Sequence, residues 1–430
     1  MNHFEDRPGP SGEGELWCED VRLAEIAEQV GTPVYVYSSA TLRRHYQVFR
    51  DALRQALGPD RDILIAYAVK ANANLSVIKT LSDLGAGADT VSEGEIRRAL
   101  AAGVPADRVI FSGVGKTDAE LAFALSVGVA EINIESESEL ERLGQIAARL
   151  NRRPAVAIRV NPDVGAGGHA KITTGKADSK FGVSLMEAKR LYRRASTHAN
   201  LNAVGLACHI GSQISDLTPL ESAFVTMREM ARDLRAEGFP VSRLDLGGGL
   251  GAPYADAPDP PSPADYAAMV ARVFAKFDVN LAFEPGRMLV ANAGVLLTRV
   301  ITRHDRPEGR KFVVVDAGMN DLLRPSLYDA YHAIRPVRQG NGAPLEAFDV
   351  VGPICETGDI FAKDRSLPNL AEGDLVAMLS AGAYGASMGS EYNARPLAAE
   401  VLVQGARFAV IRRRPTYEDM LARETLADFL

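Results

Sequence analysis

The chain has 430 residues, 47% of them hydrophobic, so it is long enough to bury a large core and to form more than one domain. Its 48 basic and 55 acidic residues give a net charge of −7, which argues against a nucleic-acid-binding surface and favours small-molecule chemistry. No apolar run reaches the roughly 18 residues that span a bilayer, and the start lacks a signal-peptide pattern, so we expect a cytoplasmic protein. Three widely separated cysteines, Cys18, Cys208 and Cys355, indicate neither a disulfide framework nor a metal site.

The N-terminal residues are predicted to lead into a strand and a helix. Residues 1–14 carry too few apolar groups to offset the entropy lost on ordering, so we expect them to be disordered. Residues 21–30 have the pattern of a short amphipathic helix, and residues 32–37 that of a strand after a proline. Apolar residues at helical spacing then cover residues 41–57.

A repeating pattern begins with the stretch that ends at Lys70. Seven consecutive apolar residues, 63–69, are typical of a strand buried on both faces of a parallel sheet. Helical patterns such as residues 92–102 and 137–150 separate the strands that follow. The predicted strands cover residues 63–70, 85–92, 108–113, 131–136, 155–162, 203–211, 243–249 and 280–287. This number of strand–helix units, in roughly 225 residues, fits a (β/α)8 barrel, although an open doubly wound sheet has the same periodicity.

After residue 287 the predicted strands follow one another too closely for crossover helices, which favours an antiparallel β-domain. These strands cover residues 295–302, 311–316, 349–352, 374–380, 397–404 and 407–412. We expect the strand near Tyr35 to join this domain, and the proline-rich residues 258–263 to form a surface loop of the barrel half. The predicted division is therefore a disordered segment over 1–14, a segment over 15–40 that joins the β-domain, a barrel over 41–287 and the β-domain over 288–430.

Polar residues gather at the predicted carboxyl ends of the barrel strands, where barrel enzymes carry their chemistry. Lys70 must reach water, meet a carboxylate or form a Schiff base with an aldehyde. The glycine-rich residues 247–251 follow the seventh strand, where barrels tend to bind phosphate, although a tight turn would use the same residues. Glu284 follows the eighth strand, and either a protonated pyridine nitrogen or Arg287 would offset the cost of burying its charge. His209 ends the sixth strand, either as a structural residue or as a ring that stacks on a cofactor.

These four features together match the needs of pyridoxal 5′-phosphate. The cofactor requires a lysine for its imine, an acid for its ring nitrogen, glycines for its phosphate and a flat group for the face of its ring. Its ring accepts the electron pair left when a bond at the α-carbon of an amino acid breaks. The sequence therefore predicts a pyridoxal-phosphate enzyme that acts on amino acids.

The chain resembles the fold type III (alanine-racemase-fold) pyridoxal-phosphate decarboxylases from about residue 15 to its end. The resemblance is carried by residues 67–72 (YAVKAN), 209–213 (HIGSQ), 247–249 (GGG), 284–287 (EPGR) and 355–356 (CE). Within that group, three further segments are similar to those of the diaminopimelate decarboxylases: residues 174–182, 316–328 and 414–419. The segment 174–182 is also a candidate lid.

This resemblance implies a barrel with a β-domain, and a homodimer with the active site at the subunit interface. It implies that Lys70 forms the Schiff base, that His209 stacks on the ring and that Glu284 meets the ring nitrogen. Cys355, contributed by the other subunit, would be the proton donor. The remaining cofactor contacts implied are Ser212, Gly249 and Gly286 at the phosphate, with Arg287 and Tyr384 near the phosphate and substrate.

The substrate is inferred from the cations and acids that remain. A substrate with a second amino-acid head needs cations for its distal carboxylate, and Arg287 and Arg324 offer bidentate guanidinium groups. Tyr328 adds a hydroxyl and Glu356 a carboxylate for the distal amine. A surface ion pair with Asp321 is the alternative use of Arg324.

We therefore expect decarboxylation of meso-2,6-diaminopimelate at its D-centre to give L-lysine, the last step of lysine biosynthesis. The alternatives are a decarboxylase of ornithine, lysine or carboxynorspermidine, a non-catalytic paralogue that binds the cofactor, and a racemase. A racemase would need a second base opposite Lys70.

Overall fold

The computed structural model describes residues 3–10, 12–165, 174–175, 179–255, 257–338 and 344–430, and these divide into two compact units. One unit comprises Met1–Leu42, Tyr254–Pro258 and Val290–Leu430, and the other comprises Arg43–Pro253 and Asp259–Leu289. The segment Tyr254–Pro258 thus groups with the first unit, whereas the sequence placed it in the barrel. We call the two parts the β unit and the barrel unit.

The barrel unit contains a closed parallel barrel of eight strands, which confirms the predicted (β/α)8 architecture over the open sheet. Its strands are β5 (Ile63–Ala68), β6 (Gly87–Thr90), β7 (Val109–Phe111), β8 (Glu131–Ile134), β9 (Ala155–Arg159), β10 (Asn202–Ala207), β11 (Arg243–Asp245) and β12 (Asn280–Phe283). Every strand expected from the sequence is present, and the structure ends each of them earlier. The residues beyond those ends form the loops at the carboxyl face.

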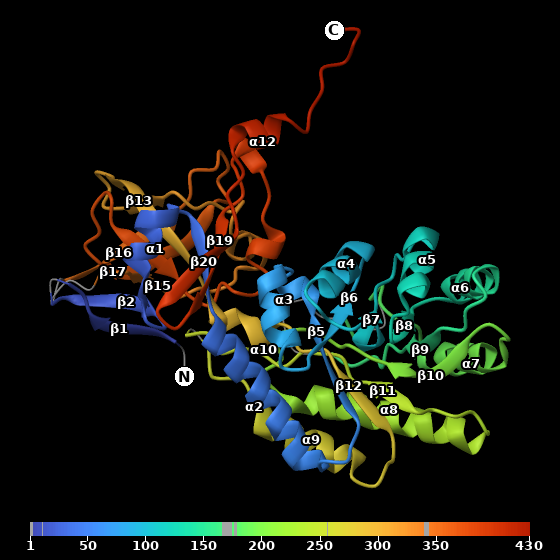
Figure 1. Cartoon of the computed structure of the whole chain (residues 1–430). Helices are drawn as coiled ribbons and strands as arrows, with labels where there is room; N and C mark the ends of the chain where they lie inside the picture. The colour runs from blue at the N-terminus through green and yellow to red at the C-terminus, as the bar shows by residue number, and fades with distance from the viewer. Residues whose placement is uncertain (1–2, 11, 166–173, 176–178, 256, 339–343) are drawn as a thin grey trace. The chain divides into compact units, whose positions relative to one another are not determined.

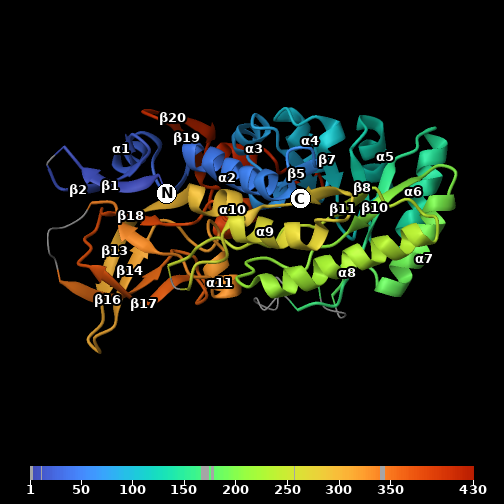
Figure 2. The same cartoon turned by 90° about the horizontal axis from the view of Figure 1, so that it is seen from below.

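Helices flank the barrel strands on the outside (Figure 1). They are α2 (Ser39–Leu57), α3 (Leu75–Ser82), α4 (Glu93–Ala101), α5 (Asp118–Val127), α6 (Glu137–Arg149), α7 (Leu185–Thr197), α8 (Leu217–Ala236), α9 (Pro263–Phe274) and α10 (Arg287–Val290). Many begin at a polar residue whose side chain accepts a backbone N–H of the first turn, as Ser92 does for α4 and Ser136 for α6. In Figure 2, α8 and α9 run side by side, joined by an edge-on contact between the rings of Phe224 and Tyr266.

Side-chain alternation along the strands determines which residues face the interior of the barrel. Leu64, Ala66, Ile110 and Ala282 form a buried apolar cluster there. Because alternate residues of a strand point to the same face, the residue two positions after Ala282 is also directed inward. That residue is Glu284. The alternation that directs apolar side chains into the barrel therefore also directs this carboxylate inward, at the carboxyl end of the strands.

The β unit is built on a nine-stranded sheet that includes a strand from before the barrel. Its strands are β4 (Val34–Ser38), β13 (Gly294–Asp305), β14 (Lys311–Val315), β15 (Ile334–Pro336), β16 (Leu345–Val351), β17 (Ile360–Pro368), β18 (Leu375–Met378), β19 (Ala399–Gln404) and β20 (Arg407–Arg412). As predicted, the strand near Tyr35 joins this sheet, where β4 pairs with β13 and β19. Most neighbouring strands of this sheet are antiparallel, as expected. The sheet is nevertheless mixed, because β4 runs parallel to β19 and β14 runs parallel to β16.

A small antiparallel sheet, β1 (Phe4–Pro8), β2 (Gly14–Cys18) and β3 (Val21–Arg22), packs with α1 (Leu23–Val30) on the main sheet. The expected disorder over residues 1–14 is therefore wrong for Phe4–Pro8. The ring of Phe4 joins the core of the unit, and β1 pairs along its whole length with β2. The apolar content of this segment is low, but the apolar residue that it has is buried.

The β unit also contains two strands that were not predicted and two short helices. β15 and β17 were not predicted, because neither carries a continuous apolar run; β17 reads IFAKDRSLP. The short helices are α11 (Arg324–Tyr328) and α12 (Tyr417–Leu421). None of the helices in the described parts of the chain is both long and apolar enough to cross a membrane.

Candidate active site

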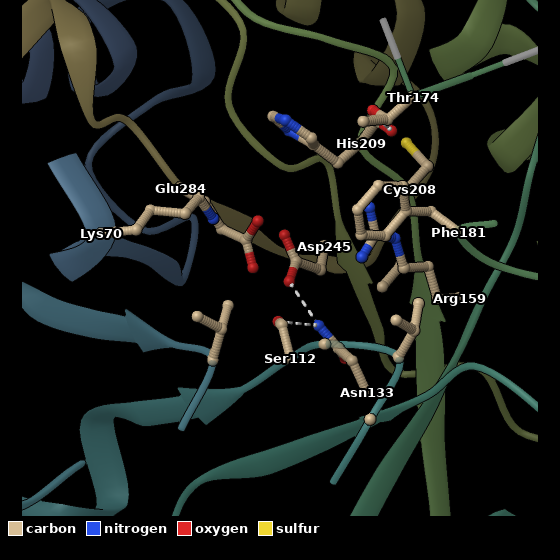
Figure 3. A pocket seen from close by; sticks show the side chains of 15 residues that line it. Lys70, Ser112, Asn133, Arg159, Thr174, Phe181, Cys208, His209, Asp245 and Glu284 are labelled. Carbon is tan, nitrogen blue, oxygen red and sulfur yellow. Dashed lines mark hydrogen bonds between the residues drawn. The ribbon is translucent and has the colours of Figure 1, made fainter. Parts of the chain in front are cut away.

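A cavity of ≈ 390 Å³ lies at the carboxyl ends of the barrel strands (Figure 3). Three of the predicted site residues line it, namely Lys70, His209 and Glu284. The wall also includes polar residues that the sequence analysis did not assign: Ser112, Asn133, Arg159, Thr174 and Asp245. The barrel therefore brings together residues that are up to about half the chain apart.

Lys70 follows β5 on a single turn of 3-10 helix, Val69–Ala71, and pairs with a buried acid. Its Nζ lies 2.7 Å from Oδ2 of Asp89, whose side chain is fully buried at the end of β6. Burial by itself raises the pKa of Asp89, but the positive charge and hydrogen bond of Lys70 outweigh it, so the pKa is lowered overall. Asp89 is therefore ionised beside the amine.

Two further buried acids, Asp245 and Glu284, point toward each other in the centre of the cavity wall (Figure 3). Burial, and then the proximity of the other carboxyl groups, raises the pKa of Glu284 well above its usual range. Burial also raises the pKa of Asp245, although a hydrogen bond with Glu284 and another from the amide of Gly247 oppose this. Both carboxyl groups therefore hold a proton more tightly than free carboxyl groups do.

Asn133 orients Asp245 from below. Its Nδ2 donates to Oδ2 of Asp245 at 3.2 Å and to the hydroxyl of Ser112 at 3.1 Å, as the dashed lines in Figure 3 show. All three side chains come from neighbouring or facing strands of the barrel. The acid at the floor of the cavity is therefore held by fixed donors and does not move freely.

His209 is a neutral ring in this environment. Burial, followed by the charges of Lys70 and Arg159, lowers its pKa to about 3. Its Nδ1 accepts the backbone N–H of Gly248 at 3.2 Å, so the proton of the neutral ring lies on Nε2. The structure thus presents a flat, uncharged imidazole at the cavity wall.

The glycines of residues 247–249 are required by the backbone itself. A Cβ at Gly247 would lie 2.3 Å from the carbonyl oxygen of Cys208, and one at Gly248 would lie 2.3 Å from that of Glu284. Gly247 and Gly249 also have φ values of 64° and 117°, which disfavour other residues. The tight-turn explanation therefore accounts for this run without a ligand.

Ser212 and Arg287 meet in the loops that follow β10 and β12. The Nε and Nη2 atoms of Arg287 lie 3.2 Å and 3.1 Å from the hydroxyl oxygen of Ser212, and the guanidinium is almost fully buried. Gly286 is buried beside them. This contact joins the segments 209–213 and 284–287, two of the motifs by which the chain resembles the decarboxylase family.

Arg159 is the most prominent residue of the wall that sequence reasoning missed. Its Nη1 lies 2.7 Å from Oε1 of Glu135, and its guanidinium is 4.8 Å from the centre of the Phe181 ring. Glu135 also accepts the backbone N–H groups of Gly113 and Gly182, at 2.9 Å and 3.1 Å. These contacts hold the guanidinium at the edge of the cavity.

A buried ion pair supports this arrangement. Lys116 and Glu139 are both buried, and Nζ of Lys116 lies 2.6 Å from Oε1 of Glu139. The ammonium also donates to the carbonyl groups of Gly113 and Asn133, so each of its hydrogens has an acceptor. Because Oε2 of Glu139 accepts the backbone N–H of Glu135, the pair fixes the loop that holds Arg159.

The candidate lid, residues 174–182, lies partly outside the described residues. Its described part touches the cavity, where the Thr174 hydroxyl donates to the carbonyl of His209 at 2.7 Å. Phe181 also lines the cavity. Residues 176–178 are not described.

Five predicted site residues belong to the β unit. Cys355 and Glu356 lie on the loop between β16 and β17, where Cys355 is exposed and its backbone N–H donates to Oδ1 of Asn393 at 2.9 Å. A hydrogen bond with Glu356 raises the pKa of Tyr392. The loop thus presents a thiol and a carboxylate together.

The other three are Arg324 and Tyr328, at the two ends of α11, and Tyr384. The hydroxyl of Ser326 donates to the carbonyl of Gly358 at 2.7 Å, which ties α11 to the loop that carries Cys355. Tyr384 has a φ of 55°, a strained conformation for a bulky residue and one that is enriched at functional sites.

Four buried polar residues were given no role from the sequence, although their positions within apolar segments could have indicated one. Asp89, Asn133, Arg159 and Asp245 are polar residues inside or at the ends of short apolar strands, and all are buried. A polar residue that costs free energy to bury is a functional candidate when it lies at the carboxyl end of a barrel strand. The expected strand ends were too late by several residues, so these positions were read as strand interior.

Comparison with known proteins shows which family the chain is similar to. Residues 39–291 match the family model described as pyridoxal-dependent decarboxylase, pyridoxal binding domain. A diaminopimelate decarboxylase from Zymomonas mobilis is 48% identical over 418 residues, which are 97% of this chain and 98% of that protein.

Solved structures give the same result. A diaminopimelate decarboxylase from M. jannaschii, in complex with L-lysine, is 35% identical with a TM-score of 0.93, and the match covers all of both chains. A lysine/ornithine decarboxylase from Vibrio vulnificus, in complex with putrescine, is 26% identical with a TM-score of 0.77, covering 89% of this chain and 98% of that one.

Proposed function

The chain belongs to the pyridoxal-dependent decarboxylases and, within them, to the diaminopimelate decarboxylases, and we propose that it removes the D-centre carboxylate of meso-2,6-diaminopimelate to give L-lysine and CO2. The observation that carries this proposal is the meeting of Lys70, His209 and Glu284 around one cavity, within the residues that match the family model. Each comes from a different strand end.

Pyridoxal 5′-phosphate is the cofactor of this family, and the residues of the cavity fit it. Oε1 of Glu284 is buried and has no hydrogen-bond partner among the described residues, so it is an acceptor suited to the ring nitrogen. The neutral ring of His209 offers a flat surface beside it. When bound, the cofactor withdraws the electron pair of the bond that breaks at the α-carbon.

The barrel residues have separate tasks in this proposal. Lys70 would hold the cofactor covalently through Nζ, and Asp89, whose Oδ2 lies 2.7 Å from that amine, would balance its charge. Glu284 would accept a hydrogen bond from the ring nitrogen through its unpartnered Oε1, and His209 would offer its flat ring to the face of the cofactor. The phosphate would be held by Ser212, Gly249, Gly286 and Arg287, which lie in the loops after β10, β11 and β12, with a hydroxyl contact from Tyr384.

The remaining candidate residues are assigned to the substrate. Arg287 and Arg324 bind the distal carboxylate, with the hydroxyl groups of Tyr328 and Tyr384, because a guanidinium pairs with a carboxylate through two hydrogen bonds. Glu356 meets the distal ammonium group. The bond between the D-centre α-carbon and its carboxylate breaks, CO2 leaves, and a proton from Sγ of Cys355 takes its place on the carbon.

A decarboxylase of ornithine, lysine or carboxynorspermidine is the alternative enzyme with the same fold. The lysine/ornithine decarboxylase is less similar to this chain than the diaminopimelate decarboxylases are, in identity and in TM-score. A non-catalytic paralogue would have no need of Cys355 and Arg324, both of which the chain carries. These observations favour the first function.

We further propose that the enzyme works in the cytoplasm as a homodimer in which the partner subunit supplies Cys355. Cys355 is exposed on its loop, so its thiol is accessible to a partner subunit. Light scattering of the purified holoenzyme measures the mass directly, and a mass of one chain, 46.1 kDa, would contradict the dimer.

The function is tested by incubating the holoenzyme with meso-diaminopimelate and measuring L-lysine and CO2. The L,L isomer, which lacks a D-centre, is the matched control and is expected to give no product. Arg324→Ala is expected to lower kcat/KM by about 100-fold or more with unchanged cofactor absorbance, because a bidentate charged contact is lost. Arg407→Ala, at an exposed position of β20, is the control variant. Faster turnover of ornithine than of diaminopimelate would contradict the proposal.

A further inference from the structure

Arg324 is held by two side chains of the β unit that no sequence motif assigned. Its Nη1 lies 3.0 Å from Nε2 of His332 and 3.2 Å from the hydroxyl oxygen of Tyr254. The guanidinium carbon also lies 5.3 Å from the centre of the Tyr254 ring, within the range of a cation–π contact. Both Arg324 and His332 are buried, so this geometry is set by packing.

The tautomer of His332 follows from the chemistry of its two neighbours. An arginine has no acceptor, so Nε2 of His332 must accept from Nη1 of Arg324. The other ring nitrogen, Nδ1, lies 2.8 Å from the carbonyl oxygen of Leu379, which can only accept. His332 is therefore neutral with its proton on Nδ1, and it links the strand end at Leu379 to the guanidinium.

Local chain geometry brings these three residues together. α11 begins at Arg324 and ends at Tyr328. The next residue, Asp329, has a φ of 51° and turns the chain so that the backbone N–H of Ala330 bonds back to the carbonyl of Arg324. The turn returns His332 beneath the start of the helix. Tyr254 comes from Tyr254–Pro258, the short stretch of chain after β11 that belongs to the β unit.

His332 and Tyr254 both contact Nη1 of Arg324, and both side chains are neutral. Nη1 has two hydrogens, and His332 and Tyr254 offer one acceptor for each, so the plane of the guanidinium is fixed. A neutral acceptor orients the group without adding a negative charge beside it. Arg159 differs, since its Nη1 meets the carboxylate of Glu135.

We propose that His332 and Tyr254 are positioning residues that set the orientation of Arg324 toward the distal carboxylate of the substrate. This inference rests on the proposed function, which assigns that carboxylate to Arg324. Neither residue touches the reacting atoms in this account. Their loss therefore weakens binding of any ligand with the distal carboxylate, whether substrate or product, and leaves the bond-breaking step nearly unchanged.

The test compares two substitutions of His332 in the holoenzyme. His332→Asn keeps a polar group near the position of Nδ1 but loses the acceptor for Arg324, whereas His332→Gln places its Oε1 near the position of Nε2. We expect His332→Asn to raise KM for meso-diaminopimelate about tenfold or more, since a hydrogen bond to a charged group is lost, while kcat changes less than about threefold. His332→Gln should restore most of the affinity. Tyr254→Phe, which keeps the ring, should raise KM less.

Ligand binding without turnover provides an independent measurement. L-lysine carries the distal carboxylate and cadaverine does not, so His332→Asn should weaken lysine binding by the same factor as KM and leave cadaverine binding unchanged. His304→Asn, an exposed histidine of β13, is the control. Tyr254→Phe supplies the same comparison if His332→Asn fails to fold.

The outcomes separate the two proposals. An active wild-type enzyme whose His332→Asn and Tyr254→Phe variants keep wild-type KM and lysine affinity would overturn this inference alone. Equal weakening of lysine and cadaverine would also overturn it, since that result indicates general damage to the site. A wild-type holoenzyme that forms no lysine from diaminopimelate would overturn the proposed function, and this inference with it.

Discussion

Two ion pairs at opposite ends of the barrel each join a partly exposed cation to a fully buried carboxylate, yet the pKa values of the two carboxyl groups shift in opposite directions. At the carboxyl end, Lys70 meets the fully buried Asp89 at 2.7 Å, and at the amino end Arg243 meets the fully buried Glu131 at 3.4 Å. The cation is partly exposed in both. The pKa of Asp89 is lowered, whereas burial raises that of Glu131 to about 7 despite the opposing charge of Arg243.

The carboxyl group at the carboxyl end of the barrel is kept charged, whereas the one at the amino end is not. Asp89 gains a short charged contact and a hydrogen bond from Ser112, so its charge is maintained beside the cavity. The longer contact at Glu131, together with repulsion from Asp245, leaves a carboxyl group that is protonated below neutral pH. Barrel enzymes carry chemistry at the carboxyl end and stability at the other, and these pairs follow that division.

The largest effect on turnover is expected for Glu284→Gln at the carboxyl end. Gln cannot share a proton with the ring nitrogen, so kcat should fall by about 100- to 1,000-fold, the cost of removing one preorganised electrostatic contact. The thermal midpoint should change little, because the raised pKa of Glu284 means that a neutral side chain already fits there. Steady-state kinetics and a thermal melt of the same sample measure both. A large loss of stability with normal turnover would reverse the assignment.

A smaller effect on turnover is expected for Asp89→Asn. The amide keeps the shape of the side chain but removes the negative charge that lies 2.7 Å from the amine of Lys70. Proton transfers that need a charged Lys70 should slow by about 10- to 100-fold, the range of a single close charge. The pH dependence of kcat/KM should shift as well, and an unchanged profile would show that this ion pair is only structural.

Glu131→Gln is expected to leave turnover unchanged and to alter stability with pH. In the folded protein the pKa of Glu131 rises from 4.5 to about 7, so the folded state binds more protons and loses stability as pH rises through this range. The neutral amide avoids that loss. The variant should match the wild type near pH 4.5 and exceed it by about 3 kcal/mol at pH 8. Urea unfolding at both pH values measures this, and a difference independent of pH would contradict it.

The barrel was predictable because its strands are continuous apolar segments at a regular spacing. The apolar run in residues 63–70 predicted β5 directly. The predicted strand 85–92, which is rich in glycine and alanine, was supported by its place in the repeat, and it contains β6. The β unit was harder to predict. β17 pairs with β16 at the edge of the sheet, and its exposed charged residues conceal it in a single sequence.

The site was predictable where a residue type is unusual for its position. Lys70, His209 and Glu284 each end an apolar segment, so their chemistry was visible. Asp89 and Arg159 were not found, because their partners lie on other strands and only the closed barrel brings them together. His332 and Tyr254 were missed because they are 78 positions apart in the chain and only the folded β unit brings both to Arg324.

The most direct test of the account is to identify the lysine that holds the cofactor. The holoenzyme is reduced with borohydride and digested, and the modified peptide is sequenced by mass spectrometry. We predict a coloured protein that loses its visible absorbance on reduction, with the adduct on Lys70. A colourless protein at saturating cofactor, or an adduct on another lysine such as the buried Lys116, would contradict the account.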